Sequence, residues 1–168
     1  MDKDNAHFDR VVEQAREYLS PKAVPLQIPI GRGPDFHGLI DLFKMKAYIY
    51  VDETLGAEYS PEPIPDEYRA EVDEYRERLL EAVAETSEDL LERYLAEGAL
   101  DEAQLLRGLR IGTVSGAVVP VLCGSALRNR CIQPLLDAVV DYLPSPPDLP
   151  PVSGVNPLTG ETEHRASE

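Results

Sequence analysis

Val118-Val119-Pro120-Val121-Leu122-Cys123-Gly124-Ser125-Ala126 is a short apolar run that ends in three small residues. An apolar run of this length, bounded by glycines, predicts a buried strand. Pro120 has no N–H to donate, which favours an edge position or the start of the strand. Beyond it, apolar side chains recur every three or four positions, at Ile132, Leu135, Leu136, Val139, Val140 and Leu143. This spacing predicts a helix with Pro134 in its first turn.

Another amphipathic helix is predicted near the N-terminus, over residues 4–19. Its apolar face consists of Phe8, Val11, Val12, Ala15, Tyr18 and Leu19. Asp4 or Asn5 can cap its first turn. Pro21 ends it, because the residue before a proline avoids the α region.

Residues 24–51 have the composition of a small antiparallel sheet. Residues 24–30 contain Pro25 and Pro29, which cannot donate to a neighbouring strand, so an edge strand or an extended segment is expected. Residues 31–34 predict a turn. Residues 36–51 are rich in aromatic and β-branched side chains, as strands are.

Helices are expected in the next part of the chain. Residues 52–65 carry three prolines and predict a loop, and a long helix begins near Asp66. Its apolar stripe is Tyr68, Val72, Tyr75, Leu79 and Val83. The pattern Thr86-x-x-Asp89 predicts the start of a second helix, which Gly98 can end.

A third helix is predicted from about residue 101 to residue 114, weakened by Gly108 and Gly112. Residues 144–151 read as a proline-rich extended connector, and the tail to Glu168 is polar with no core pattern. Together these elements predict an α+β fold.

The charge of the chain restricts its partners. Of 168 residues, 31 are acidic and 16 basic, a formal net charge of −15. This surplus disfavours DNA and anionic membranes and suits a basic protein partner. No apolar run approaches the ~20 residues that cross a bilayer, and no signal peptide is visible. Cys123 and Cys131 alone make neither a disulfide framework nor a zinc site, so a cytoplasmic setting is expected.

Several short motifs follow one another along residues 1–158. They are Met1-Asp2, Phe8-x-Arg10-Val11-Val12-Glu13-Gln14, Val24-Pro25-Leu26-Gln27-Ile28-Pro29-Ile30-Gly31, Gly38-Leu39-Ile40-Asp41-Leu42, Lys44-Met45-Lys46-Ala47, Val119 to Ala126, and Leu135 to Pro144. In order and spacing they resemble bacterial elongation factor G. That translational GTPase moves tRNA and mRNA through the ribosome during protein biosynthesis.

The resemblance implies a division of the chain. In such factors a subdomain called G′ is inserted in the GTPase domain, between the two motifs that read guanine. Residues 24–117 would be that insert. Residues 1–23 and 118–143 would be parts of the GTPase domain, and residues 144–168 a linker and tail. The chain would then be a fragment of such a factor.

The resemblance also implies a guanine-binding site. Met1 and Asp2 match the end of the family's Asn-Lys-Met-Asp motif, and Gly124, Ser125 and Ala126 match its Gly-Ser-Ala motif. A carboxylate at Asp2 would accept hydrogen bonds from the ring N–H and the exocyclic amine of guanine. Adenine would leave that charge unpaired, at a cost above ~1–3 kcal/mol. A backbone N–H of the second motif would reach the guanine carbonyl oxygen.

Catalysis by this chain alone is not expected. Full-length members of the family bind GTP or GDP with Mg²⁺ and hydrolyse GTP. This sequence contains no G-x-x-x-x-G-K-[ST] phosphate loop, and phosphoryl transfer depends on that cradle and its metal ion. We therefore predict no catalytic residue, no metal ligand set, no GTPase activity and no measurable affinity for GDP.

An acidic helix flank is the second candidate site. Glu67, Glu71 and Glu74 lie on one flank of the predicted apolar stripe. The resemblance implies that a helix of the insert contacts the lysine-rich C-terminal domain of the ribosomal stalk protein. A solvated helix face has the same pattern, and both interpretations stay open.

Other functions also stay open. The chain could be a stand-alone acidic interaction module that uses the same helix, or an inactive product of a truncated gene. Tetracycline-resistance ribosomal protection proteins and release-factor GTPases share parts of the layout. The length of the insert and the proline-rich connector favour the elongation factor.

Overall fold

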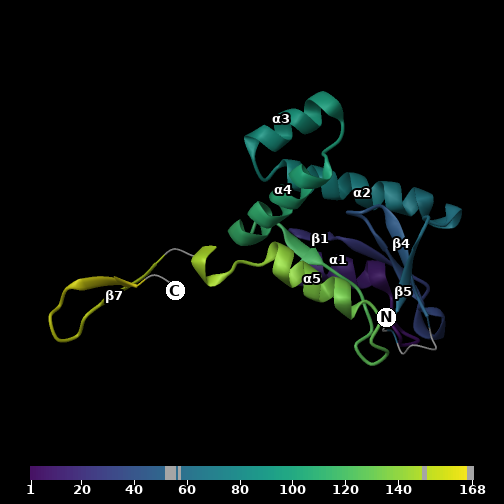
Figure 1. The fold of residues 1–168 in the computed structure, drawn as a ribbon, viewed down its shortest axis with the longest axis horizontal. Helices are drawn as coiled ribbons and strands as arrows, with labels where there is room; N and C mark the ends of the chain where they lie inside the picture. Colours follow the sequence, from purple (N-terminus) through teal and green to yellow (C-terminus); the bar gives the residue numbers. More distant parts are fainter. Residues whose placement is uncertain (52–55, 57, 149–150, 166–168) are drawn as a thin grey trace.

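The computed structural model describes residues 1–51, 56, 58–148 and 151–165. It has the α+β fold that the sequence predicts (Figure 1). The helices are α1 (Phe8–Tyr18), α2 (Arg69–Ala84), α3 (Glu88–Glu97), α4 (Glu102–Ser115) and α5 (Ile132–Tyr142). Short 3₁₀ turns occupy η1 (Gly33–Asp35), η3 (Asp66–Tyr68) and η4 (Pro146–Asp148). The strands are β1 (Ala23–Pro25), β2 (Gln27–Ile30), β3 (Gly38–Asp41), β4 (Lys46–Tyr50), β5 (Tyr59–Glu62), β6 (Val119–Val121), β7 (Val152–Val155) and β8 (Thr162–Arg165).

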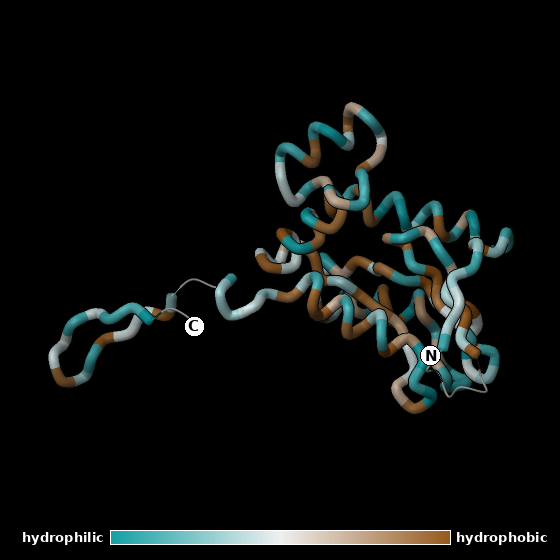
Figure 2. Tube along the Cα trace, in the orientation of Figure 1, coloured by the Kyte–Doolittle hydropathy of each residue, from teal (hydrophilic) through white to brown (hydrophobic). Residues whose placement is uncertain are grey.

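The predicted antiparallel sheet is present, with strand order β2-β3-β4-β5. Successive side chains of a strand point to opposite faces. Ile28, Ile40 and Ala47 are register partners on one face, and they are buried in the cluster that contains the apolar stripe of α2. The other face includes Leu39 and Tyr48, which belong to a second cluster with residues around the Gly124 loop. The two faces of the sheet therefore contribute to different buried clusters. Hydrophobic residues are frequent in the sheet and in the helices around it (Figure 2).

β1 and β6 are short strands that pair in parallel. Their pairing brings together the two ends of the segment 26–118. Val24 is opposite Pro120, and the Leu26 N–H donates to the Val121 carbonyl over 2.9 Å. Among the described residues β6 pairs only with β1, so the edge position that Pro120 suggested is confirmed. Val119 is 41% exposed, so the strand is not as buried as predicted.

Close packing explains the two glycines of α4. A Cβ at Gly108 would lie 2.3 Å from Val83 Cγ1, and one at Gly112 would lie 2.8 Å from Thr86 Cγ2. Both glycines therefore allow α4 to approach α2 and the turn that follows it. The sequence had indicated only their cost to the helix, whereas the structure shows what they permit.

The predicted helix caps are partly wrong. Helix α1 begins at Phe8 with His7 as N-cap and no side-chain cap, so Asp4 and Asn5 lie outside it. Helix α3 is capped by Ser87, whose hydroxyl accepts from the Leu90 N–H, while Thr86 bonds back to the carbonyl of Val83. Its predicted end at Gly98 is confirmed, because Gly98 adopts a left-handed φ of 69°.

Three strands, β5, β7 and β8, lie where none was predicted. Strand β5 crosses the predicted loop, and Pro61 is tolerated there because β5 is the edge of its sheet. Strands β7 and β8 form a hairpin within the predicted tail, and each of their residues is exposed. No alternation of buried and exposed positions could mark this hairpin in the sequence. The predicted segment 24–30 is also two strands rather than one, β1 and β2, with separate partners.

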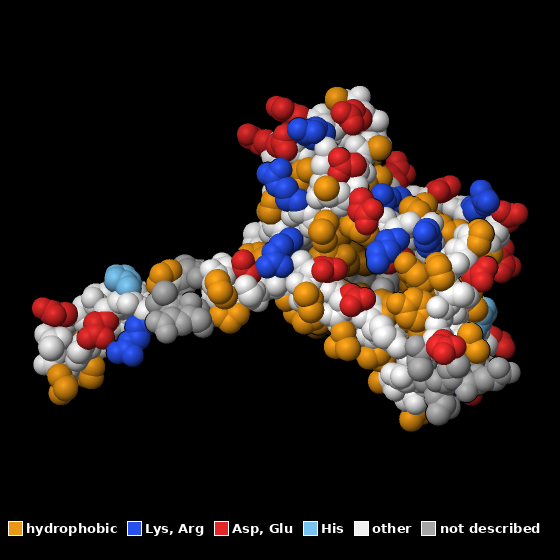
Figure 3. All heavy atoms as spheres, viewed as in Figure 1, with side chains coloured by type: hydrophobic (Ala, Val, Ile, Leu, Met, Phe, Trp, Pro, Cys, Tyr) orange, Lys and Arg blue, Asp and Glu red, His pale blue; other side chains and the backbone are white. Residues whose placement is uncertain are grey.

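The surface of α5 retains many apolar side chains. Leu136 is 59% exposed and Val140 is 77% exposed, and hydrophobic side chains follow this helix in Figure 3. In the part of the chain that the structure describes, no helix is long and apolar enough to cross a membrane.

Candidate functional site

The N-terminus lies against the Gly124 loop. The amino group of Met1 donates to the carbonyl oxygen of Gly124 over 2.7 Å, across a separation of 123 positions. The carbonyl of Met1 accepts from the Gly33 N–H over 2.9 Å. Met1 also packs against a buried cluster that includes Cys123 and Cys131. The two segments predicted to read guanine are therefore neighbours.

Ser125 connects Asp2 to this loop. A hydrogen bond from the Ser125 side chain is the main reason that the pKa of Asp2 lies below its usual range. The Asp2 side chain is 14% exposed, whereas Ser125 is 2% exposed. Asp2 is thus held ionised at the surface, with a buried hydroxyl fixing its orientation.

The backbone of residues 124–131 forms a tight loop. Ser125 and Arg130 exchange two backbone hydrogen bonds of 3.0 Å, and the Ser125 hydroxyl accepts from the Arg128 N–H. The buried guanidinium of Arg130 donates to the carbonyl of Phe36. A Cβ at Gly124 would lie 3.0 Å from the Arg130 carbonyl oxygen, so a side chain here would press against the backbone of the loop.

This geometry distinguishes the two backbone N–H groups, those of Ser125 and Ala126, that could donate to a ligand. The N–H of Ser125 is already bonded to Arg130 and cannot reach a ligand without breaking that bond. The N–H of Ala126 has no acceptor among the described residues, and Ala126 is exposed. Ala126 therefore presents the available donor, and Ser125 positions Asp2 instead.

The two cysteines behind the loop are unsuited to nucleophilic chemistry. Burial raises the pKa of the Cys123 thiol and raises that of Cys131 to about 12. Both thiols remain protonated near neutral pH, and the thiolate is the nucleophile. Their role in the structure is to fill the small core under the loop.

The acidic flank is less uniform than the sequence indicated. Glu67 lies on the 3₁₀ turn η3 and is exposed. Glu74 is exposed on α2 and forms an ion pair with Arg78 at 2.6 Å. Glu71 is partly buried, and burial, followed by the nearby charges of Asp9 and Glu74, raises its pKa. Glu71 and Glu74 are close enough for their charges to interact, but the three carboxylates differ in environment.

The contribution of Asp9 to this flank is not visible in the sequence. The hydroxyl of Tyr75 on α2 donates to the Asp9 carboxylate on α1 over 2.7 Å. Asp9 thereby comes close enough to Glu71 to raise its pKa. The pattern of a single helix could not reveal this, because the two carboxylates come from different elements.

Asp2 supplies a carboxylate acceptor and Ala126 a backbone N–H donor on the two segments that meet here. Within residues 1–51, 56, 58–148 and 151–165, no three histidine, cysteine or acidic side chains are grouped so as to hold a metal ion.

No protein-family model matches this chain. The chain is similar to a protein of Thermus thermophilus whose crystal structure is known, with 30% sequence identity and a TM-score of 0.76. The similarity covers 94% of this chain and 24% of the Thermus protein. This chain therefore spans about a quarter of the length of that protein.

Proposed function

We propose that this chain is part of a translational GTPase resembling elongation factor G, and that it contributes part of the guanine-reading pocket. The observation that carries the proposal is the contact between Met1 and Gly124, with the Asp2 carboxylate bonded to Ser125. Ala126 is exposed and Asp2 is partly exposed, whereas Ser125 is buried.

Each residue then has a separate role. The Asp2 carboxylate accepts the ring N–H and the exocyclic amine of guanine, and its lowered pKa keeps it ionised for that purpose. The Ala126 N–H donates to the guanine carbonyl oxygen. Ser125 holds the carboxylate in place, and Gly124 allows the loop to close on Arg130. Phosphates and Mg²⁺ would be bound by other parts of a full-length protein.

The partner we propose is the C-terminal domain of the ribosomal stalk protein. Glu67 and Glu74 present exposed carboxylates at one end of α2, and the chain carries a net charge of −15. Complementary charge of this kind accelerates association with a lysine-rich surface and gives the affinity a salt dependence.

One experiment tests the base-reading site directly. Guanosine and adenosine are titrated at millimolar concentration into isotope-labelled protein while amide resonances are followed by NMR. These concentrations lie far above those at which a fluorescent GDP analogue is expected to show no binding, and at them we expect guanosine alone to shift the resonances of Asp2, Ser125 and Ala126. Equal shifts with adenosine, or no shifts at these positions, would contradict the proposal.

A second function, a stand-alone acidic module, is supported by the same exposed carboxylates. To distinguish the two functions, the affinity of the chain for the stalk domain is compared with its affinity for an unrelated basic protein of similar charge. Equal affinities would favour the acidic module over a ribosomal role.

A further inference from the structure

A cavity of about 270 Å³ lies between α5 and the face of the antiparallel sheet that carries Gln27, Asp41 and Tyr48. Its floor is made by the sheet and its wall by α5, with the first turn of α4 at one side. Pockets for drug-sized ligands run from ~300 to 1,000 Å³. This cavity therefore suits a smaller molecule or a single side chain.

Gln27 lines this cavity and leaves a hydrogen-bond acceptor without a donor. Its side chain is 4% exposed, and Oε1 has no hydrogen-bond partner among the described residues. A buried carbonyl oxygen without a donor is unfavourable and calls for an explanation in a native fold. A ligand that donates an N–H into the cavity would supply one.

Negative charge dominates the rest of the lining. Four carboxylates contribute to it, those of Asp41, Glu102, Asp137 and Asp141, against a single ammonium group on Lys44. The Arg76 guanidinium outside the lining acts on Asp41, whose pKa is raised by burial, so the charge that faces a ligand comes mainly from the other three carboxylates. Asp41 is the register partner of Gln27, and its Oδ1 accepts the N–H groups of Phe43 and Lys44. The carboxylates come from the sheet, α4 and α5, so the fold gathers them rather than one helix.

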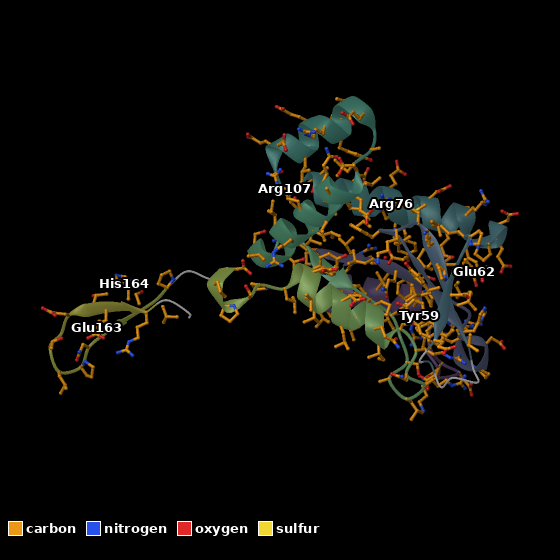
Figure 4. All side chains as sticks on the ribbon, in the orientation of Figure 1. Tyr59, Glu62, Arg76, Arg107, Glu163 and His164 are labelled. Carbon is orange, nitrogen blue, oxygen red and sulfur yellow. The ribbon has the colours of Figure 1, made fainter. Side chains whose placement is uncertain are left out.

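Aromatic rings complete the lining. Tyr48 and Tyr59 meet edge to face with ring centroids 5.4 Å apart, and both line the cavity. Tyr59 projects from β5 on the side of α5 (Figure 4). Aromatic rings beside carboxylates favour an organic cation, which can stack on a ring while it bonds to oxygen.

We propose that this cavity binds an alkyl guanidinium group. The planar guanidinium has five N–H donors and stacks on aromatic rings, so it can satisfy Gln27 Oε1, the carboxylates and the tyrosines together. A bare metal ion fits less well, because no group of three ligating side chains is present among the described residues. The carboxylates exclude an anion.

The experiment is a calorimetric titration of the full chain with agmatine and with an arginine blocked at both ends. The first represents a free small molecule and the second an arginine side chain of a protein. The neutral analogue, blocked citrulline, is the control ligand. We expect saturable binding of at least one cation that weakens with salt, and no binding of citrulline. The cation that binds more tightly shows whether the guanidinium group comes from a free small molecule or from an arginine side chain of a protein.

Variants connect the binding to the cavity. Gln27→Leu should weaken binding by about tenfold or more, because a hydrogen bond to a charged group is lost. The double variant Asp137→Asn, Asp141→Asn changes only exposed carboxylates, and it tests the site even if Gln27→Leu fails to fold. Asp73→Asn on α2, outside the lining, is the matched control.

The outcomes are distinct. Binding that is reduced in the cavity variants and retained in Asp73→Asn supports the proposal. Absence of binding by both cations, equal binding of citrulline, or affinities that the cavity variants leave unchanged would overturn it.

Discussion

Gly108 on α4 faces Val83 on α2 so closely that a Cβ at Gly108 would lie 2.3 Å from Val83 Cγ1. The same Cβ at Gly108 would lie 2.8 Å from Leu90 Cδ1. Both neighbours are fully buried, so neither can turn away into solvent. The contact between α2, α3 and α4 therefore depends on the absence of a side chain at this position.

Gly108→Ala is accordingly expected to destabilise the protein, although alanine is the better helix former. Overpacking a tight core costs about 1–3 kcal/mol, more than the ~1 kcal/mol gained in helix propensity. Urea unfolding followed by circular dichroism measures the change. Gly154→Ala is the control, because a Cβ there meets nothing within 4 Å, and an equal loss in both variants would refute the explanation.

The bond from the Tyr75 hydroxyl to Asp9 links α1 to α2. Tyr75→Phe removes this bond with little change in shape, and we expect a loss of about 0.5–1.5 kcal/mol in the free energy of unfolding. Tyr18→Phe, at a position where the ring is 72% exposed, should have no effect. A Tyr75→Phe protein as stable as wild type would show that the bond does not contribute.

Acid should destabilise the protein in part through Asp2. Because the pKa of Asp2 is lowered in the folded state, its contribution to stability is complete above the unfolded value of ~4 and is lost as the pH falls through the folded pKa. The urea midpoints of wild type and Asp2→Asn should therefore differ at pH 6 and converge at lower pH. Asp148, whose pKa is also lowered, is present in both proteins and cancels in the difference.

A constant difference between the two proteins across this pH range would contradict the role of Asp2. Ser125→Ala provides an independent comparison, because it removes the hydroxyl that lowers the pKa and leaves the carboxylate. Its curve should depend on pH less steeply than that of wild type.

Charge reversal tests the proposed stalk contact. Glu67→Lys and Glu74→Lys should weaken binding of the stalk domain, and the loss should shrink as salt is added. Glu71→Lys is a less direct test, because this residue also lies beside Asp9 and its reversal changes the contact between α1 and α2. Asp137→Asn, on α5, serves as the control. Affinity that is unaffected by the first two substitutions would reject this surface.

Nucleotide binding by this chain alone is expected to be too weak to measure with a fluorescent GDP analogue. The described residues offer groups for the base, and the sequence contains no G-x-x-x-x-G-K-[ST] loop for the phosphates. GTP hydrolysis is expected to equal that of buffer. Saturable binding at micromolar concentration would show that the base contacts suffice.

Local signals predicted much of the fold. The apolar spacing located α2 and α5, and Gly98 ended α3 as expected. These features depend on neighbours three or four positions away, which a sequence displays directly. The order of short motifs also brought Met1-Asp2 and Gly124-Ser125 into one hypothesis, and the structure places them in contact.

Features made by distant segments were missed. The parallel pairing of β1 with β6 joins residues far apart in the sequence, and three-residue strands carry too little pattern to reveal it. The nearness of Asp9 to Glu71 and the cavity beside Gln27 arise in the same way, from separate elements. Strands β7 and β8 were missed for another reason, since neither has a buried face.

The β1–β6 pair also bears on how this protein tolerates change. Leu26 and Val121 are joined by a backbone hydrogen bond. The polypeptide between them therefore begins and ends at almost the same point in space. Insertions or deletions inside it need not stretch its attachment points, and each doubling of a flexible loop adds only ~0.6 kcal/mol of closure entropy. Evolution can therefore lengthen, shorten or exchange the segment between Leu26 and Val121 while the positions of Asp2 and Ala126 stay the same.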